Sequence, residues 1–155
     1  IEDTHMSPVD LEETLDDVER LVRHKMLEKE VRFVRRRADG RAVVRGNGNK
    51  LKQVFINLLL NSVEAVRPGG TIEVESRVRA EPPTVEVRVI DDGCGIPDGI
   101  RDRIFDPFFS TKSAEKNTGL GLSISQHIIE THEGFLDFRS GDRTVFTVHL
   151  PLLKQ

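Results

Sequence analysis

The sequence predicts an α+β domain in which a mixed, mostly antiparallel sheet of about five strands is covered on one face by about three helices. Apolar residues recur at helical spacing in three separate segments of the chain. Apolar and polar residues alternate in segments between and after these helices, as they do in half-buried strands. The length of 155 residues suffices for one such domain and is too short for two large ones.

The composition indicates a soluble domain from a reducing compartment. With 37% hydrophobic residues and a net charge of −3, the chain lacks the strong positive charge of a general nucleic-acid binder, so we expect no nucleic-acid partner. Apolar runs such as VFINLLL are far shorter than the roughly 20 residues that cross a bilayer, and we expect no membrane contact by this domain. A single cysteine excludes an internal disulfide. We expect a cytoplasmic location, whether or not the full-length protein is anchored in a membrane.

The first predicted helix follows a short linker. Residues 1–9 include Pro8 and show no periodicity, so we interpret them as the linker and residues 10–155 as the domain. Asp10 and Glu13 resemble a capping box at the start of a helix. The apolar residues at helical spacing that follow are Leu11, Leu15, Val18, Val22 and Met26.

Two short strands and a long helix come next. The strands are predicted at Val31–Arg36 and Arg41–Arg45, on either side of the turn at residues 38–40. A break at residues 46–49 then precedes a helix over about Lys50–Val66.

The second half of the chain is predicted as two hairpins separated by a loop and a helix. The first hairpin pairs Thr71–Val78 with Thr84–Ile90. A glycine-rich loop over Asp91–Pro97 and an irregular polar segment over about residues 98–118 follow, and a connection of this length is usually functional or disordered. The remaining predicted elements are a helix at Gly119–His132 and strands at Phe135–Arg139 and Thr144–Leu150.

The long helix carries a narrow polar row on an otherwise apolar circumference. At 100° per residue, five polar residues fall within an arc of about 80°, and they are Lys50, Gln53, Asn57, Asn61 and Glu64. Burying such groups without partners costs on the order of 1–3 kcal/mol each. The row therefore either faces water or binds a polar ligand or cation, and the short amides of Asn57 and Asn61 suit a hard cation such as Mg²⁺.

Two glycine loops surround a phenylalanine cluster. In the first loop, glycines let the backbone approach a flat ligand, and the carboxylate of Asp91 can accept a hydrogen bond from an exocyclic amine; an ordinary tight turn has the same appearance. The second, Gly119-Leu120-Gly121, opens a helix whose free N–H groups favour phosphate, although one GxG is weak evidence. Between them, we expect the phenylalanines of IFDPFFSTK to pack this segment onto the domain and Lys112 to reach a phosphate.

These motifs, in this order, resemble the catalytic ATP-binding domain of sensor histidine kinases, a branch of the Bergerat-fold superfamily that also includes gyrase-type topoisomerases and certain chaperones. QVFINLLLNSVEA resembles the asparagine box, DDGCGIP the first glycine box, IFDPFFSTK the phenylalanine box and NTGLGLSIS the second glycine box. The similarity covers roughly residues 10–150. It implies a Bergerat fold over the catalytic domain, residues 10–155, with a mobile ATP lid at about residues 98–118.

The resemblance also implies which residues bind nucleotide. Asn57 and Asn61 match the asparagines that engage the phosphates and Mg²⁺, and Asp91 matches the carboxylate that recognises the adenine amino group. Gly93 and Gly95 match glycines beneath the base. The complete implied ATP-binding set is Asn57, Asn61, Glu64, Asp91, Gly93, Gly95, Ile96, Lys112, Thr118, Gly119, Leu120, Gly121 and Leu122.

The implied chemistry is phosphoryl transfer. Hydrolytic relatives carry a glutamate four residues before the box asparagine, and here that position is Asn57, whose amide cannot act as a general base near neutral pH. The resemblance implies transfer to a histidine on a helical phosphoacceptor and dimerisation domain, its own or a partner's, and relay to a response regulator. None of His5, His24, His127, His132 and His149 lies in a motif like H-E-x-x-N-P; for the last three we predict surface or packing roles.

We therefore expect the acceptor histidine outside this chain, and the chain itself to be mostly monomeric. Two alternatives stay open. One is a degenerate nucleotide-sensing or docking module, which Asp92 leaves possible because many relatives carry Asn there. The other is a gyrase- or chaperone-type ATPase, which the missing glutamate and the phenylalanine box both disfavour.

Overall fold

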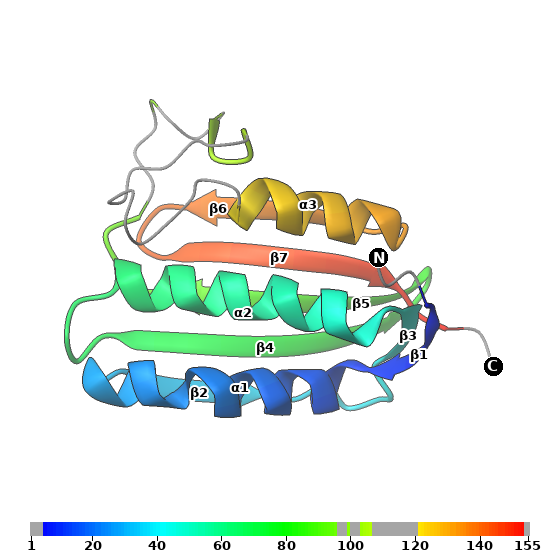
Figure 1. Cartoon of the computed structure of the whole chain (residues 1–155), viewed down its shortest axis with the longest axis horizontal. Helices are drawn as coiled ribbons and strands as arrows, with labels where there is room; N and C mark the ends of the chain where they lie inside the picture. The colour runs from blue at the N-terminus through cyan, green and yellow to red at the C-terminus, as the bar shows by residue number, and fades with distance from the viewer. Residues whose placement is uncertain (1–4, 96–98, 100–102, 107–120, 154–155) are drawn as a thin grey trace.

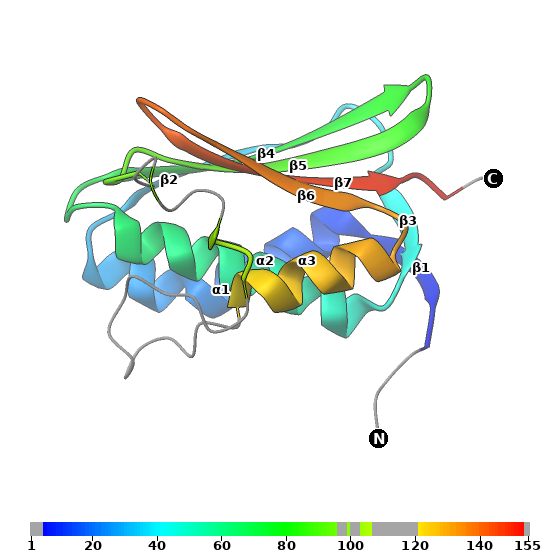
Figure 2. The same ribbon diagram turned by 90° about the horizontal axis from the view of Figure 1, so that it is seen from above.

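Three helices form one layer on a single face of the main sheet, as Figure 2 shows from above. The computed structural model describes residues 5–95, 99, 103–106 and 121–153. The helices are α1 (Leu11–Glu28), α2 (Gly48–Ala65) and α3 (Gly121–Thr131), and α2 lies between the other two (Figure 1).

The main sheet has five strands in the order β2-β4-β5-β7-β6. Their bounds are β2 (Arg32–Arg36), β4 (Thr71–Ala80), β5 (Pro83–Asp91), β6 (Phe135–Ser140) and β7 (Thr144–Pro151). β2 runs parallel to β4, and the other three neighbouring pairs are antiparallel. The predicted fold class, a mixed and mostly antiparallel five-stranded sheet with three helices on one face, is therefore confirmed.

A second, two-stranded sheet lies at one end of the domain. It pairs β1 (Ser7–Asp10) with β3 (Val43–Gly46) in antiparallel register. Residues 7–9 thus form a strand inside the segment predicted as a linker, and Val9 is buried in the core. A four-residue strand containing Pro8 has too few positions to show a period, and its pairing partner lies far along the chain.

The two longer helices begin at capping residues that the sequence presents clearly. The Asp10 side chain accepts hydrogen bonds from the backbone N–H groups of Glu12 and Glu13, which confirms the predicted cap of α1. Asn47 caps α2 by accepting from Lys50 N–H at 3.0 Å, so α2 begins two residues earlier than predicted. The apolar stripe predicted on α1 is buried at every position, namely Leu11, Leu15, Val18, Val22 and Met26.

The hydrophobic core fills the space between the helices and the sheet. Val85, Val87 and Val89 of β5 point into it, which confirms the alternation expected of a strand with one covered face. Below them, α2 buries most of its circumference. Its core residues are Leu51, Val54, Phe55, Leu58, Leu59 and Val63.

The first residues of the phenylalanine cluster pack onto the domain as predicted. Ile104 is buried, and the ring of Phe105 meets the ring of Phe138 edge-on, with centroids 6.0 Å apart. Phe108 and Phe109 lie outside the described residues. The contact of Phe105 ties the segment after β5 to the far edge of the sheet at β6.

Candidate functional site

The central helix α2 carries the predicted polar row. Asn57 and Asn61 are half-buried and lie one turn apart on the same face of the helix. Lys50, at one end of the row, is also half-buried, whereas Gln53 and Glu64 are exposed. The row therefore borders the solvent, and its Asn57 lies on the side of α2 that faces α3.

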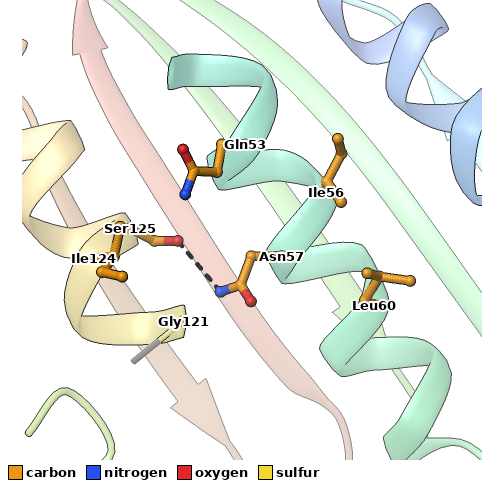
Figure 3. Close-up of a pocket in the computed structure, with 7 residues that line it drawn as sticks. All are labelled: Gln53, Ile56, Asn57, Leu60, Gly121, Ile124 and Ser125. Carbon is orange, nitrogen blue, oxygen red and sulfur yellow. Dashed lines mark hydrogen bonds between the residues drawn. The ribbon is translucent and has the colours of Figure 1, made fainter. Parts of the chain in front are cut away.

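A pocket of about 230 Å³ opens between α2 and α3 beside Asn57 (Figure 3). It is lined by Gln53, Ile56, Asn57, Leu60, Gly121, Ile124 and Ser125. Most of this lining is apolar, with a few polar groups that converge, which is the usual make-up of a ligand pocket. The pocket brings together Asn57 from the asparagine box and Gly121 from the second glycine box.

Gly121 begins α3 directly against the amide of Asn57. A Cβ atom added at Gly121 would collide with Oδ1 of Asn57, so a residue with a side chain cannot take this place without displacing the asparagine. The Asn57 amide also donates through Nδ2 to Oγ of Ser125, 3.3 Å away (Figure 3). The start of α3, whose free N–H groups favour anions, thus faces the asparagine oxygen.

Asp91 ends β5 as a buried carboxylate, 3% exposed. Its Oδ2 accepts a hydrogen bond of 2.9 Å from Oγ of Ser62, and its Oδ1 accepts one of 2.9 Å from the backbone N–H of Gly93. These two bonds fix the orientation of the carboxylate. An ionised carboxylate only accepts hydrogen bonds, so Asp91 presents an oriented acceptor at the end of β5.

The first glycine loop packs against the C-terminal end of α2. A Cβ added at Gly93 would lie 2.6 Å from the carbonyl oxygen of Ala65, and the N–H of Cys94 donates to that same oxygen at 3.2 Å. Gly95 has a φ of +75°, which favours glycine.

The C-terminal end of α2 is also capped by a lysine. Nζ of Lys29 donates to the carbonyls of Val63 and Glu64 and so caps the negative end of the α2 dipole.

The two ends of the predicted site therefore both meet the helix α2. Ser62, which holds Asp91, is five residues beyond Asn57, a rise of about 7.5 Å along the helix axis. Asn61 lies between these positions, directly before Ser62. The asparagine row, Asp91 and the two described parts of the glycine boxes thus come together around α2.

Other predicted residues differ in how closely they join this arrangement. Leu122 packs against the hydrophobic core, and Glu64 is exposed. Asp92 accepts a hydrogen bond of 3.0 Å from the backbone N–H of Thr71 at the start of β4. The predicted positions Ile96, Lys112, Thr118, Gly119 and Leu120 lie outside the described residues.

Two serines that hold the predicted side chains were not predicted from the sequence. Ser62 and Ser125 are each 1% exposed and contact Asp91 and Asn57 respectively. The sequence feature that could have identified them is a small hydroxyl side chain at a core position of a helix. A buried hydroxyl needs a partner, and here the partners are predicted ligand-binding groups.

The histidines occupy surface and packing positions, as predicted. His127 is exposed, and the ring of His149 stacks on the ring of Phe135 with centroids 4.0 Å apart. His132 is buried, and its Nε2 accepts a hydrogen bond of 3.0 Å from the backbone N–H of Asn47. The ring proton is therefore on Nδ1, which donates to the carbonyl of Ile128 at 2.7 Å. His132 thereby joins the end of α3 to the start of α2.

The described side chains define what kind of metal site is possible. Among the residues that the structure describes, no three His, Cys, Asp or Glu side chains gather into a metal site. A cation beside Asn57 would take amide oxygen together with ligand phosphate, a donor set that suits Mg²⁺.

No described helix is both long and apolar enough to cross a membrane.

The sequence matches a known protein family and curated proteins. Residues 46–154 match the family described as histidine kinase-, DNA gyrase B- and HSP90-like ATPases. Over 110 residues, the chain is 42% identical to sporulation kinase A of Bacillus subtilis strain 168, a match that covers 70% of this chain and 18% of that protein. The chain thus spans less than a fifth of the length of this relative.

Solved structures share the fold. The catalytic domain of histidine kinase ThkA in a nucleotide-free form superimposes with a TM-score of 0.84 at 31% identity, covering 95% of this chain and 97% of that one. Histidine kinase ThkA in complex with the response regulator protein TrrA matches with a TM-score of 0.81 at 30% identity, covering 96% and 42% of the two chains. The predicted Bergerat fold is confirmed by this likeness.

Proposed function

Because this chain belongs to the family of histidine kinase-, DNA gyrase B- and HSP90-like ATPases, and within it to the catalytic domains of sensor histidine kinases, we propose that it binds Mg²⁺ with ATP and donates the γ-phosphoryl group to a histidine. Membership of this ATPase family implies the ATP binding. The metal ion, the roles of single residues and the acceptor belong to the proposal.

One observation carries the proposal: a buried acceptor at the end of β5 and an amide beside the N-terminus of α3 meet the same helix, α2, at positions five residues apart. Asp91, held by Ser62, marks one end, and Asn57, against Gly121, marks the other. A ligand with an amino-bearing base at one end and phosphates at the other would pair with the carboxylate at the first end and with the amide and helix N-terminus at the second.

At the base end, Asp91 accepts a hydrogen bond from the exocyclic amine of adenine. Its carboxylate already accepts from Ser62 and Gly93, so it is held in place before the ligand arrives. A base that presents a carbonyl oxygen at this position, as guanine does, would set two acceptors against each other. Gly93 and Gly95 let the backbone approach the face of the base.

At the phosphate end, the amide oxygens of Asn57 and Asn61 hold Mg²⁺, and the N-terminal turn of α3 from Gly121 faces the phosphate oxygens. When bound, the metal neutralises charge that develops on the transferring group. The remaining proposed ATP-binding residues are Glu64, Ile96, Lys112, Thr118, Gly119, Leu120 and Leu122.

The reaction is phosphoryl transfer. A nitrogen of an acceptor imidazole attacks the γ-phosphorus, the bond to the bridging oxygen breaks, and ADP leaves. The side chain at Asn57 cannot take a proton from water near neutral pH, so hydrolysis is slow. The acceptor is on a helical phosphoacceptor and dimerisation domain, in the same full-length protein or a partner.

A response regulator receives the phosphoryl group next. The complex of histidine kinase ThkA with the response regulator protein TrrA supports this partner class. We also propose that the domain is cytoplasmic and, without its helical domain, mostly monomeric.

Transfer in trans tests the proposal. The chain is mixed with a separately supplied phosphoacceptor domain of a related kinase and with ATP labelled at the γ-phosphate. We expect label on the acceptor that depends on Mg²⁺, and Asn61→Ala to reduce it at least tenfold. Calorimetry on the chain alone should show binding of both ATP and ADP.

Other outcomes point to the alternatives. Nucleotide binding without any transfer would favour a nucleotide-sensing or docking module. Steady release of phosphate at about 1 s⁻¹ or faster, without an acceptor, would favour an ATPase of the gyrase or chaperone type.

A further inference from the structure

Ser125 is a buried hydroxyl residue whose contact lies inside the pocket. It is 1% exposed, and its Oγ receives the hydrogen bond from Nδ2 of Asn57 at 3.3 Å. Figure 3 shows this bond crossing from α2 to α3, with the oxygen of the Asn57 amide on the side away from Ser125. The two residues are 68 positions apart in the sequence.

An asparagine amide has one end that binds cations and one that does not. The oxygen can ligate a hard cation, whereas the NH₂ group is a double donor and repels one. A rotation of the amide by half a turn exchanges these ends at almost no change in shape. The partners of the amide therefore decide which end the ligand meets.

In this structure, the partners of Asn57 favour one orientation. Ser125 takes the NH₂ group, and the atom of the amide closest to an added Cβ on Gly121 is Oδ1. That oxygen therefore lies at the positive end of the α3 dipole, which favours oxygen over NH₂. Both contacts come from α3, so the placement of α3 against α2 determines the orientation of the Asn57 amide.

We propose that Ser125 is a positioning residue for Mg²⁺-dependent nucleotide binding, because it turns the Asn57 amide so that Oδ1 faces the metal. This inference rests on the proposed function, and it assigns a role to Ser125, the last residue of the second glycine box, which is not among the predicted ATP-binding residues. Ser125 touches neither metal nor nucleotide and acts through Asn57.

Calorimetry tests the inference by measuring ADP affinity with Mg²⁺ and with EDTA, and the ratio of the two is the magnesium enhancement. We expect Ser125→Ala to reduce this enhancement about tenfold, as loss of an outer partner of a metal ligand typically does, and to change the affinity in EDTA less than twofold. Ser125→Cys nearly keeps the side-chain volume but replaces the oxygen by sulfur, a weak acceptor. It should therefore reduce the magnesium enhancement as Ser125→Ala does.

Two controls separate orientation from general damage. Ser76→Ala removes another buried serine hydroxyl, one that donates to Glu12 at 3.2 Å on the other side of the domain, and it should leave the enhancement unchanged. In an Asn57→Ala background, Ser125→Ala should have no further effect on the enhancement, because there is no amide left to turn.

The outcomes are distinguishable. If the wild-type chain binds ADP and Ser125→Ala keeps the full magnesium enhancement, or loses affinity equally with and without the metal, the inference is wrong and the proposed function stands. The same holds if Ser125→Ala is as damaging in the Asn57→Ala background. If the wild-type chain binds no adenine nucleotide under either condition, the proposed function fails and the inference fails with it.

Discussion

The donors of Ser62 and Gly93 orient the carboxylate of Asp91, which we propose as the group that recognises the base. Asp91→Asn replaces one oxygen by NH₂, which then faces the donors from Ser62 or Gly93 or the amine of the base. We expect ATP affinity to fall by about 2 kcal/mol, or roughly thirtyfold, as for a lost hydrogen bond to a charged group. Calorimetry with ATP and with inorganic triphosphate checks this, since triphosphate affinity should stay within a factor of two. Equal losses for both ligands would remove Asp91 from the base end.

Gly121 lies directly against the amide of Asn57, and we expect its identity to matter for the proposed site. Gly121→Ala places a Cβ against Oδ1 of Asn57, so we expect nucleotide affinity to fall at least tenfold even though alanine favours helix. Gly48→Ala is the matched control, because Gly48 also begins a helix and its added Cβ would meet nothing within 4 Å. Titration with a fluorescent ADP analogue measures both variants. Similar affinities for the two would show that the Asn57 contact is unimportant.

At the scale of elements, His132 joins the end of α3 to the start of α2. His132→Ala leaves the N–H of Asn47 without its imidazole acceptor and opens a cavity, so we expect the free energy of unfolding to drop by about 2–4 kcal/mol. His127→Ala, on the exposed side of α3, should change it by less than about 0.5 kcal/mol. Urea denaturation compares the two. A small effect at both positions would mean that the contact of His132 between α3 and α2 contributes little to stability.

The contact between α1 and β2 depends on charge and therefore on pH. Burial raises the pKa of the Asp16 carboxyl, but hydrogen bonds from Arg37 and Arg35 lower it more, and the net pKa lies below its ordinary value. Because the folded-state pKa is lowered, the carboxylate stabilises the fold above its unfolded pKa, and this contribution is lost as the pH falls through the folded pKa.

We therefore expect Asp16→Asn to lower the free energy of unfolding at pH 7 by less than about 1 kcal/mol, since the carboxylate is partly exposed. The difference from wild type should shrink below about pH 4. Asp39→Asn, at an exposed position in the turn after β2, serves as the control. Urea titrations at several pH values measure the effect, and a difference that persists at low pH would contradict it.

At the scale of the whole molecule, α2 connects the two ends of the site. A nucleotide bound along it should slow hydrogen exchange both in residues 91–95 and in the first turn of α3, because it contacts both. Exchange measured by mass spectrometry with and without Mg²⁺ and ADP checks this. Inorganic triphosphate should protect the α3 end alone. Protection by ADP at one end alone would contradict a nucleotide that spans both.

Local features of the sequence were sufficient to predict most elements. The cap at Asp10, the apolar stripe of α1 and the alternation in β5 depend on neighbours along the chain, and each is confirmed. The asparagine and glycine motifs likewise indicated a nucleotide site before their geometry was known. The strand at residues 7–9 was missed because its partner, β3, is distant in sequence and its own pattern is too short to show a period.

A local sequence pattern does not indicate which residues from distant parts of the chain come into contact. The bond from Ser62 to Asp91 spans 29 positions and that from Asn57 to Ser125 spans 68, and a serine is compatible with core, surface and cap alike. The motifs were enough to predict which residues bind a nucleotide, since their chemistry is a property of each side chain. Their orientation arises when α2, α3 and β5 pack together, because a buried hydroxyl must find its partner among whatever groups that packing places nearby.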